Sequence, residues 1–202
     1  MVGRVTTATQ ARRADARRNV DAILRAAREV LSERSDAELT AVAERAQVHR
    51  VTLYRHFRTR EALISALHNA WLDDTEVAVL ATNVDAADVR TEVEALLRRV
   101  YGTHLEWRTY GWVPGYSSGT PERRRRELVG SLTSALFARA QAEGVLREDL
   151  NQREIMAAWA GPVIHVTGNI ADRTWTLDEA VDYSMRLLSP KGARPQSVSG
   201  SE

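Results

Sequence analysis

The 202-residue chain contains no cysteine, so neither a disulfide framework nor a thiolate metal site is possible. No apolar run approaches the length of a membrane span, and the N-terminus lacks the apolar core of a signal peptide. We therefore expect a cytoplasmic protein with no membrane partner. Lysine occurs once, at Lys191, and we attribute the dominance of arginine to GC-rich coding bias.

Signatures of catalysis are also missing from the sequence. It has no Ser-His-Asp arrangement, no phosphate-binding glycine loop and no paired-carboxylate motif. The 5 histidines are scattered and no two of them stand four residues apart, so we predict no metal site. We expect a protein that is not an enzyme and needs no cofactor.

Charge is distributed unevenly along a chain whose net charge is only +1. Residues 1–60 carry 13 arginines against 7 acidic residues, a net charge of +6, whereas the remainder carries 15 basic against 20 acidic residues, a net charge of −5. A basic N-terminal third on a mildly acidic body is typical of a DNA-binding head joined to a regulatory domain.

The most informative pattern lies in residues 38–57, which predict two short helices joined by a tight turn. Leu39 and Val42 fall on one face of the first helix, and Leu53 and Phe57, four residues apart, form the buried face of the second. A second helix of this kind fits the major groove of DNA. Its polar groups then point away from the core: Arg50, Thr52, Tyr54, Arg55 and His56.

The order Thr52-Leu-Tyr-Arg-His-Phe57, followed at once by Thr59-Arg-Glu-Ala-Leu63, resembles the TetR family of one-component regulators. The resemblance is specific over residues 17–72 and rests on length and helix layout beyond them. It implies an all-α fold of about nine helices, with an N-terminal three-helix helix-turn-helix head and a larger helical body for ligand binding and dimerisation. No stretch of the chain reads as a strand.

The resemblance also implies a division into domains. We expect a DNA-binding domain over residues 1–60, with a flexible arm at 1–11, and a regulatory and dimerisation domain over residues 61–189. Residues 190–202 are polar and predict a disordered tail. In the arm region, Arg4, Arg12, Arg13, Arg17 and Arg18 could reach phosphates or a minor groove, or could form a solvated tail.

Two positions of the predicted head depart from the family pattern. Gln47 stands where the turn usually carries glycine, so a positive φ there would store strain of about 1 kcal/mol. His49 replaces the usual serine cap and is a poorer N-cap. Upstream of the turn, Ser35-Asp-Ala-Glu38 fits a capping box for the first of the two helices.

The roles of individual head residues follow from their chemistry and from the matching family positions. Arg50 could contact guanine O6 and N7 with two hydrogen bonds, or could be a solvated arginine. Val51 or the methyl group of Thr52 could touch a thymine methyl group, and Arg55 suits a phosphate or solvent. By resemblance, the phosphate and further DNA contacts are Thr40, Tyr54, His56 and Arg60.

The resemblance further implies a homodimer formed by the last two helices of the body. The candidate interface residues lie along one side of each of these helices, where they could equally bury against their own subunit. They are Met156, Trp159, Ala160, Val163, Ala180, Tyr183, Ser184, Leu187 and Leu188.

A small-molecule effector, apolar or aromatic, is the other partner that the resemblance implies. Aromatic side chains with a few polar tips are typical of pockets for such ligands, although each could equally be plain core. The candidates are Trp71, Leu97, Tyr101, His104, Trp107, Trp112, Phe137, Trp159 and His165. The segment 109–119, rich in glycine and aromatic residues, would be a lid.

Together these observations predict a ligand-responsive transcriptional regulator. The main reading is a repressor that binds a pseudo-palindromic operator as a dimer and is released by a small molecule. The alternative is a ligand-independent architectural DNA-binding protein or orphan regulator with a solid body.

Overall fold

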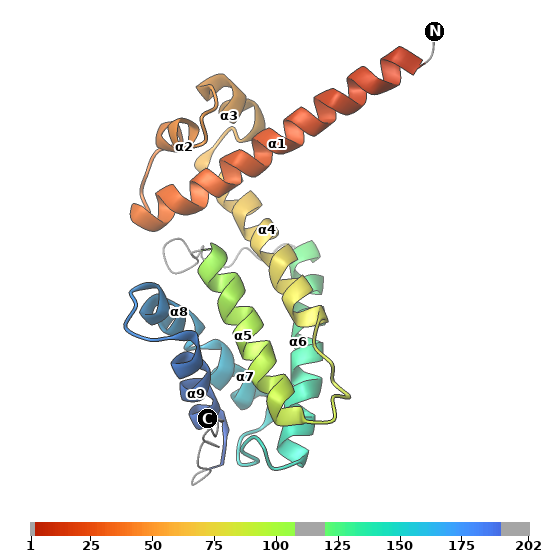
Figure 1. Cartoon of the computed structure of the whole chain (residues 1–202), viewed down its shortest axis with the longest axis vertical. Helices are drawn as coiled ribbons and strands as arrows, with labels where there is room; N and C mark the ends of the chain where they lie inside the picture. Colours follow the sequence, from red (N-terminus) through yellow and green to blue (C-terminus); the bar gives the residue numbers. More distant parts are fainter. Residues whose placement is uncertain (1–2, 108–119, 191–202) are drawn as a thin grey trace, which may run out of the picture. The chain divides into compact units, whose positions relative to one another are not determined.

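A computed structural model describes residues 3–107 and 120–190 of the chain (Figure 1). Within these ranges the chain forms nine helices and no strand, which confirms the predicted all-α fold. The helices are α1 (Gly3–Glu33), α2 (Leu39–Arg45), α3 (Arg50–His56), α4 (Arg60–Leu80), α5 (Val89–Trp107), α6 (Thr120–Ala142), α7 (Gln152–Ala160), α8 (Val163–Ala171) and α9 (Leu177–Leu188).

The described residues divide into two compact units. The head comprises those up to Trp71, and the body comprises those from Leu72 onward, so that α4 contributes to both units. The domain boundary predicted between residues 60 and 61 falls at the start of α4, whereas the compact units divide within α4, between residues 71 and 72. None of the described helices combines the length and apolarity that crossing a bilayer requires.

The head is built on the C-terminal half of α1. Ile23, Ala27 and Val30 of this helix are buried, as are Leu53 of α3 and Leu67 of α4. Burying a side chain as large as valine, leucine or isoleucine contributes about 1.5–3 kcal/mol to folding. Within this packing α2 contacts α1, and α3 contacts α2.

Two features of the head differ from the predictions. The helix α1 begins at Gly3 and not near Arg12, so most of the segment expected to be a flexible arm is helical. A stable helix can propagate through residues without helix breakers at little cost, because nucleation is the expensive step. The predicted capping box at Ser35 was wrong, since α2 begins at Leu39 and its N-cap, Glu38, makes no side-chain capping bond.

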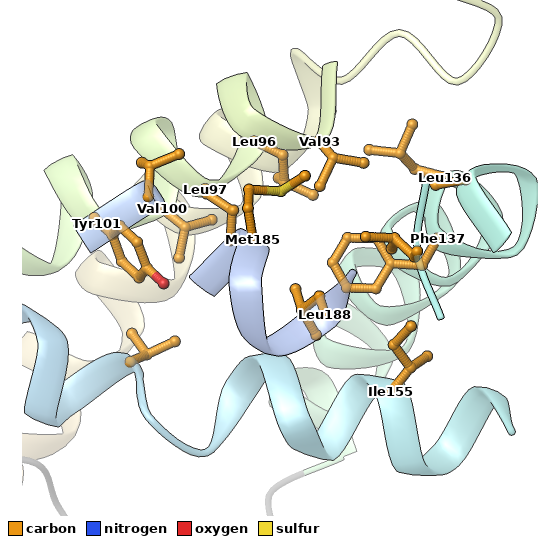
Figure 2. Close-up of a cluster of buried hydrophobic side chains, with 14 of the residues drawn as sticks. Val93, Leu96, Leu97, Val100, Tyr101, Leu136, Phe137, Ile155, Met185 and Leu188 are labelled. Atoms are coloured by element: carbon orange, nitrogen blue, oxygen red, sulfur yellow. The ribbon is translucent and has the colours of Figure 1, made fainter. Parts of the chain in front are cut away.

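The body packs around α5, which contacts α6, α8 and α9. Figure 2 shows apolar side chains from four helices converging on a common core. They come from α5 (Val93, Leu96, Leu97, Val100, Tyr101), α6 (Leu136, Phe137), α7 (Ile155) and α9 (Met185, Leu188).

The ends of the body helices follow the capping signals in the sequence. Asn151 and Thr176 each close a capping box, in which the side chain accepts a hydrogen bond from the third helical residue. Gly144 takes a positive φ of 71° after α6, as a C′ glycine does. At Gly161 and Pro162 the chain is divided into α7 and α8, because proline cannot donate the backbone hydrogen bond of a continuous helix.

Candidate nucleic-acid interface

The turn between α2 and α3 is closed by a Schellman motif. Val48 N–H donates to the carbonyl of Ala43 at 3.0 Å, and Gln47 N–H donates to the carbonyl of Glu44 at 3.1 Å. Gln47 adopts a φ of 55°, the left-handed conformation that glycine accepts without strain. We predicted strain at Gln47 if its φ were positive, and this tight turn does hold Gln47 at a positive φ.

The helix α3 is divided sharply into a buried and an exposed face. Leu53 is fully buried, and Phe57 at the end of the helix is buried as well. On the other face Val51 is 81% exposed and Tyr54 is 44% exposed. An exposed valine on a short helix makes no contribution to its own subunit's core, so this face is available to a partner.

Arginines surround the exposed face of α3. Arg50 and Arg55 are exposed on the helix itself, and Arg58 is exposed in the turn that follows. The guanidinium of Arg50 lies 3.6 Å from the carboxylate of Glu44 across the turn, in an ion pair whose side chains are 65% and 73% exposed. Such an exposed pair contributes only about 0–1 kcal/mol, so Arg50 can exchange Glu44 for another acceptor.

The remaining predicted DNA contacts lie in more restricted positions. Thr52 and Thr40 are half-buried, and the Thr40 hydroxyl donates to Glu38 Oε2 at 3.3 Å. His56 is half-buried, and its Nε2 atom is buried without a hydrogen-bond partner, so this nitrogen does not face solvent. The guanidinium of Arg60 donates to the carbonyl of Ser35, which ties the start of α4 to the loop between α1 and α2.

Two contacts fix the helices that carry these side chains. Thr59 caps α4, since its Oγ1 accepts from Ala62 N–H at 3.2 Å. The second contact, which the sequence did not indicate, joins α2 to α1. Arg45 pairs with Glu29 at 3.0 Å and with Glu33 at 3.2 Å, and both acceptors raise the pKa of the guanidinium. Its partners stand too far apart in the sequence for helical spacing to indicate them.

Several of the predicted effector residues lie together in the core of the body. Leu97, Tyr101 and Phe137 are fully buried in the body core, and the Phe137 ring meets Trp159 edge to face at 5.7 Å. Trp159 is half-buried, and its indole nitrogen has no hydrogen-bond partner.

The other predicted effector residues differ in their surroundings, and His104 and Trp107 are buried on α5. His165 is exposed, Trp71 is half-buried in the head unit, and Trp112 lies outside the described residues, as does the predicted lid. An open groove of about 480 Å³ runs along α4 and α5, and no predicted effector residue lines it. No group of three or more His, Asp or Glu side chains in the described ranges could hold a metal ion.

Burial within the body governs the chemistry of its polar groups. The Tyr101 hydroxyl shares a hydrogen bond with Ser184 Oγ, and burial raises the pKa of this tyrosine. Burial lowers the pKa of His104 to about 4, so its imidazole is neutral near pH 7. The indole of Trp107 donates to Asp74 Oδ2 at 2.7 Å.

The predicted dimer residues fall into two classes. Ala180, Ser184, Leu188 and Val163 are buried within their own subunit. They leave no surface for a second copy to cover, because the amphipathic stripe of α9 packs on α5. Ala160 is exposed and Leu187 is 39% exposed, and the half-buried members are Met156, Trp159 and Tyr183.

Comparisons with known proteins agree with this geometry. A sequence model described as bacterial regulatory proteins, tetR family, matches residues 23–67, which span all of α2 and α3. A TetR family transcription regulator from Marinobacter aquaeolei VT8 superposes with a TM-score of 0.64 at 14% identity, covering 89% of this chain and 99% of that chain. The TetR transcriptional regulator SCO0520 from Streptomyces coelicolor superposes with a TM-score of 0.55 at 28% identity, covering 85% and 99%.

Residues 23–67 match the tetR family of bacterial regulatory proteins, and the fold of the chain is that of TetR-family regulators. A further relative by fold is the TetR-like regulator LfrR from Mycobacterium smegmatis, solved in complex with proflavine, with a TM-score of 0.60 at 21% identity, covering 84% of this chain and 94% of that chain. No curated protein matches the chain by sequence. The match over residues 23–67 and the TetR-like fold imply a DNA-binding regulator and suggest a regulator in place of an enzyme.

Proposed function

We propose that this TetR-family protein is a repressor that binds a pseudo-palindromic operator as a homodimer and is released by a small molecule. The observation that carries the DNA-binding part is the division of α3. Its apolar face is anchored in the head core while Arg50, Val51, Tyr54 and Arg55 face outward. A helix presented in this way fits the major groove, where an arginine near its first turn discriminates guanine by about 1–3 kcal/mol.

In this proposal some head residues contact bases and others contact phosphates. Arg50 reads a base, with Val51 and Thr52 beside it at the start of α3. Tyr54, Arg55, His56 and Arg60 hold phosphates, and Thr40 on α2 supports them. Arg60 already donates to Ser35 through one guanidinium nitrogen, and its other N–H groups remain for a phosphate.

A dimer is needed because one short helix reads only a few base pairs. Two copies would bring two α3 helices to half-sites that are one turn of DNA, or a multiple of it, apart. We propose that the second copy covers the surface formed by Met156, Trp159, Ala160, Tyr183 and Leu187, the predicted dimer residues that are not already buried.

The last part of the proposal is release of the protein from DNA by a small-molecule effector. The aromatic groups of the body and the neutral His104 suit an apolar or aromatic molecule, and proflavine, bound by the fold relative LfrR, is of that chemistry. The effector would shift the population of dimers away from the form that fits two half-sites. We further propose that the protein works in the cytoplasm, where its DNA is.

Fluorescence anisotropy of the purified protein on DNA from upstream of its own gene tests the proposal, with scrambled DNA as the control. We expect salt-sensitive binding of two protomers to the upstream DNA and much weaker binding to the scrambled DNA. Equal and weak binding to both would instead favour the alternative, an architectural protein without an effector. Addition of proflavine or a similar aromatic cation to the specific complex tests release.

A further inference from the structure

The helix α1 extends well beyond the core of the head. Its first fully buried side chain is Ile23, although the helix begins at Gly3. At a rise of 1.5 Å per residue, the N-terminal part spans about 30 Å. Among the described side chains of residues 10–18, only Ala16 is even half-buried. The family match begins at residue 23, so this extension lies outside the matched segment.

The amino-acid composition of the extension indicates which kind of partner it could bind. Residues 3–18, which we name the α1 arm, contain 5 arginines (Arg4, Arg12, Arg13, Arg17, Arg18) and one acid, Asp15. Their only apolar side chain larger than alanine is Val5, so the arm has no stripe to bury in a protein core or in a lipid surface. The arm carries a net charge of +4, and its described side chains are almost all exposed, so it complements a polyanion.

We propose that the α1 arm binds the phosphates of duplex DNA that flanks the bases read by α3. This inference rests on the proposed DNA-binding function and adds a second contact region to it. Arg13 and Arg17 stand one helical turn apart and are both exposed. Arg18 is paired with Asp15, whereas neither Arg13 nor Arg17 has an acidic partner within the described residues. Arg13 and Arg17 are therefore the phosphate ligands of the arm.

The test compares the wild type with Arg13→Gln/Arg17→Gln on two duplexes, one limited to the operator and one extended by about ten base pairs of arbitrary sequence at each end. Glutamine has nearly the helix propensity of arginine, so the arm stays helical. The wild type should bind the longer duplex more tightly, and the variant should lose that gain. Each lost phosphate contact should reduce the salt slope of log K by about 0.9, which is roughly fivefold in affinity at 0.15 M salt.

Two further variants complete the design. Asp15→Asn removes the acid that pairs with Arg18, and should tighten binding to the longer duplex. Arg153→Gln, which removes an exposed charge from α7 in the body, should change neither duplex. Circular dichroism verifies that each variant is folded.

Several outcomes would overturn the inference in distinguishable ways. If the arginine variant weakened both duplexes equally, the arm would contact the operator itself and not its flanks. If the variant matched the wild type on both duplexes, the arm would not bind DNA at all, although the proposed function would stand. If the wild type did not discriminate operator from scrambled DNA, the proposed function would fail and the inference with it.

Discussion

The two units place their polar side chains in opposite environments. In the head, Arg50, Tyr54 and Arg55 lie on the outer face of α3, where solvent is their main neighbour. In the body, Tyr101, Ser184 and His104 are buried among apolar groups. Exposed charge contributes little to folding and remains free for a partner, whereas buried polar groups must be satisfied internally or kept neutral. Substitutions on the outer face of α3 should therefore change DNA binding without loss of stability. Substitutions of buried residues in the body should instead lower stability.

The largest contrast should come from removing one side chain from each region. Phe137→Ala empties a fully buried position beside Trp159, and should lower the free energy of unfolding by ~3–5 kcal/mol. Val51→Ala changes a side chain that is 81% exposed, and should alter stability by less than about 0.5 kcal/mol. Urea unfolding followed by circular dichroism measures both. A Val51 effect as large as that of Phe137 would mean that α3 is packed and not free.

The buried His104 should make the body sensitive to acid. Its pKa is lowered to about 4 in the folded protein, against about 6.5 in the unfolded chain, so the unfolded state binds more protons between these values. Stability from this group is complete above pH 6.5 and is lost as the pH falls toward 4, by about 3 kcal/mol at most. His104→Gln should remove that pH dependence from thermal unfolding curves. An unchanged slope in the variant would show that other groups control acid unfolding.

Backbone strain offers a matched pair of smaller effects. Gln47→Gly should stabilise the head by ~0.5–1 kcal/mol, because glycine adopts the positive φ of this turn without strain. Gly144→Ala, at a φ of 71° after α6, should destabilise the body by about 1 kcal/mol. Opposite shifts in the unfolding midpoint are expected. If Gln47→Gly lowered stability, the Gln47 side chain would be making a contribution that outweighs the strain.

The smallest effect concerns the exposed pair of Glu44 and Arg50. Glu44→Gln should release Arg50 and remove a negative charge near the DNA, tightening binding by at most roughly fivefold per half-site. Asp36→Asn removes the same charge from an exposed position between α1 and α2, and serves as the control. Anisotropy titrations give the affinities. Weaker operator binding by Glu44→Gln alone would mean that the carboxylate holds Arg50 in its reading position.

Local signals in the sequence account for several helix boundaries and for the tight turn between α2 and α3. Asn151, Thr176 and Gly144 end or begin helices where their chemistry indicates, because capping depends on a few neighbouring residues. The apolar spacing of α2 and α3 likewise predicted which side chains are buried. The Ser35 capping box failed because the loop before α2 is longer than that motif assumes, and α2 begins only at Leu39.

Contacts between segments that are distant in the sequence could not be predicted in this way. The stripe of Ala180, Ser184 and Leu188 was correctly recognised as one side of a helix, but periodicity does not reveal what covers a stripe. In the structure α5 covers it, with the hydroxyl of Tyr101 bonded to Ser184. The ion pair between Glu44 and Arg50 was missed for a related reason, because it crosses a turn and not a helical repeat.

We propose above all that the exposed face of α3 recognises the DNA sequence through Arg50. Fluorescence anisotropy of the wild type and Arg50→Ala on the operator, and on a set of operators with single base changes, tests it most directly. We predict that the wild type loses affinity by about 1–3 kcal/mol when the contacted guanine is changed, and that Arg50→Ala no longer distinguishes the bases at that position. If Arg50→Ala kept the full base preference of the wild type at every position, the account of α3 as the reading helix through Arg50 would be contradicted.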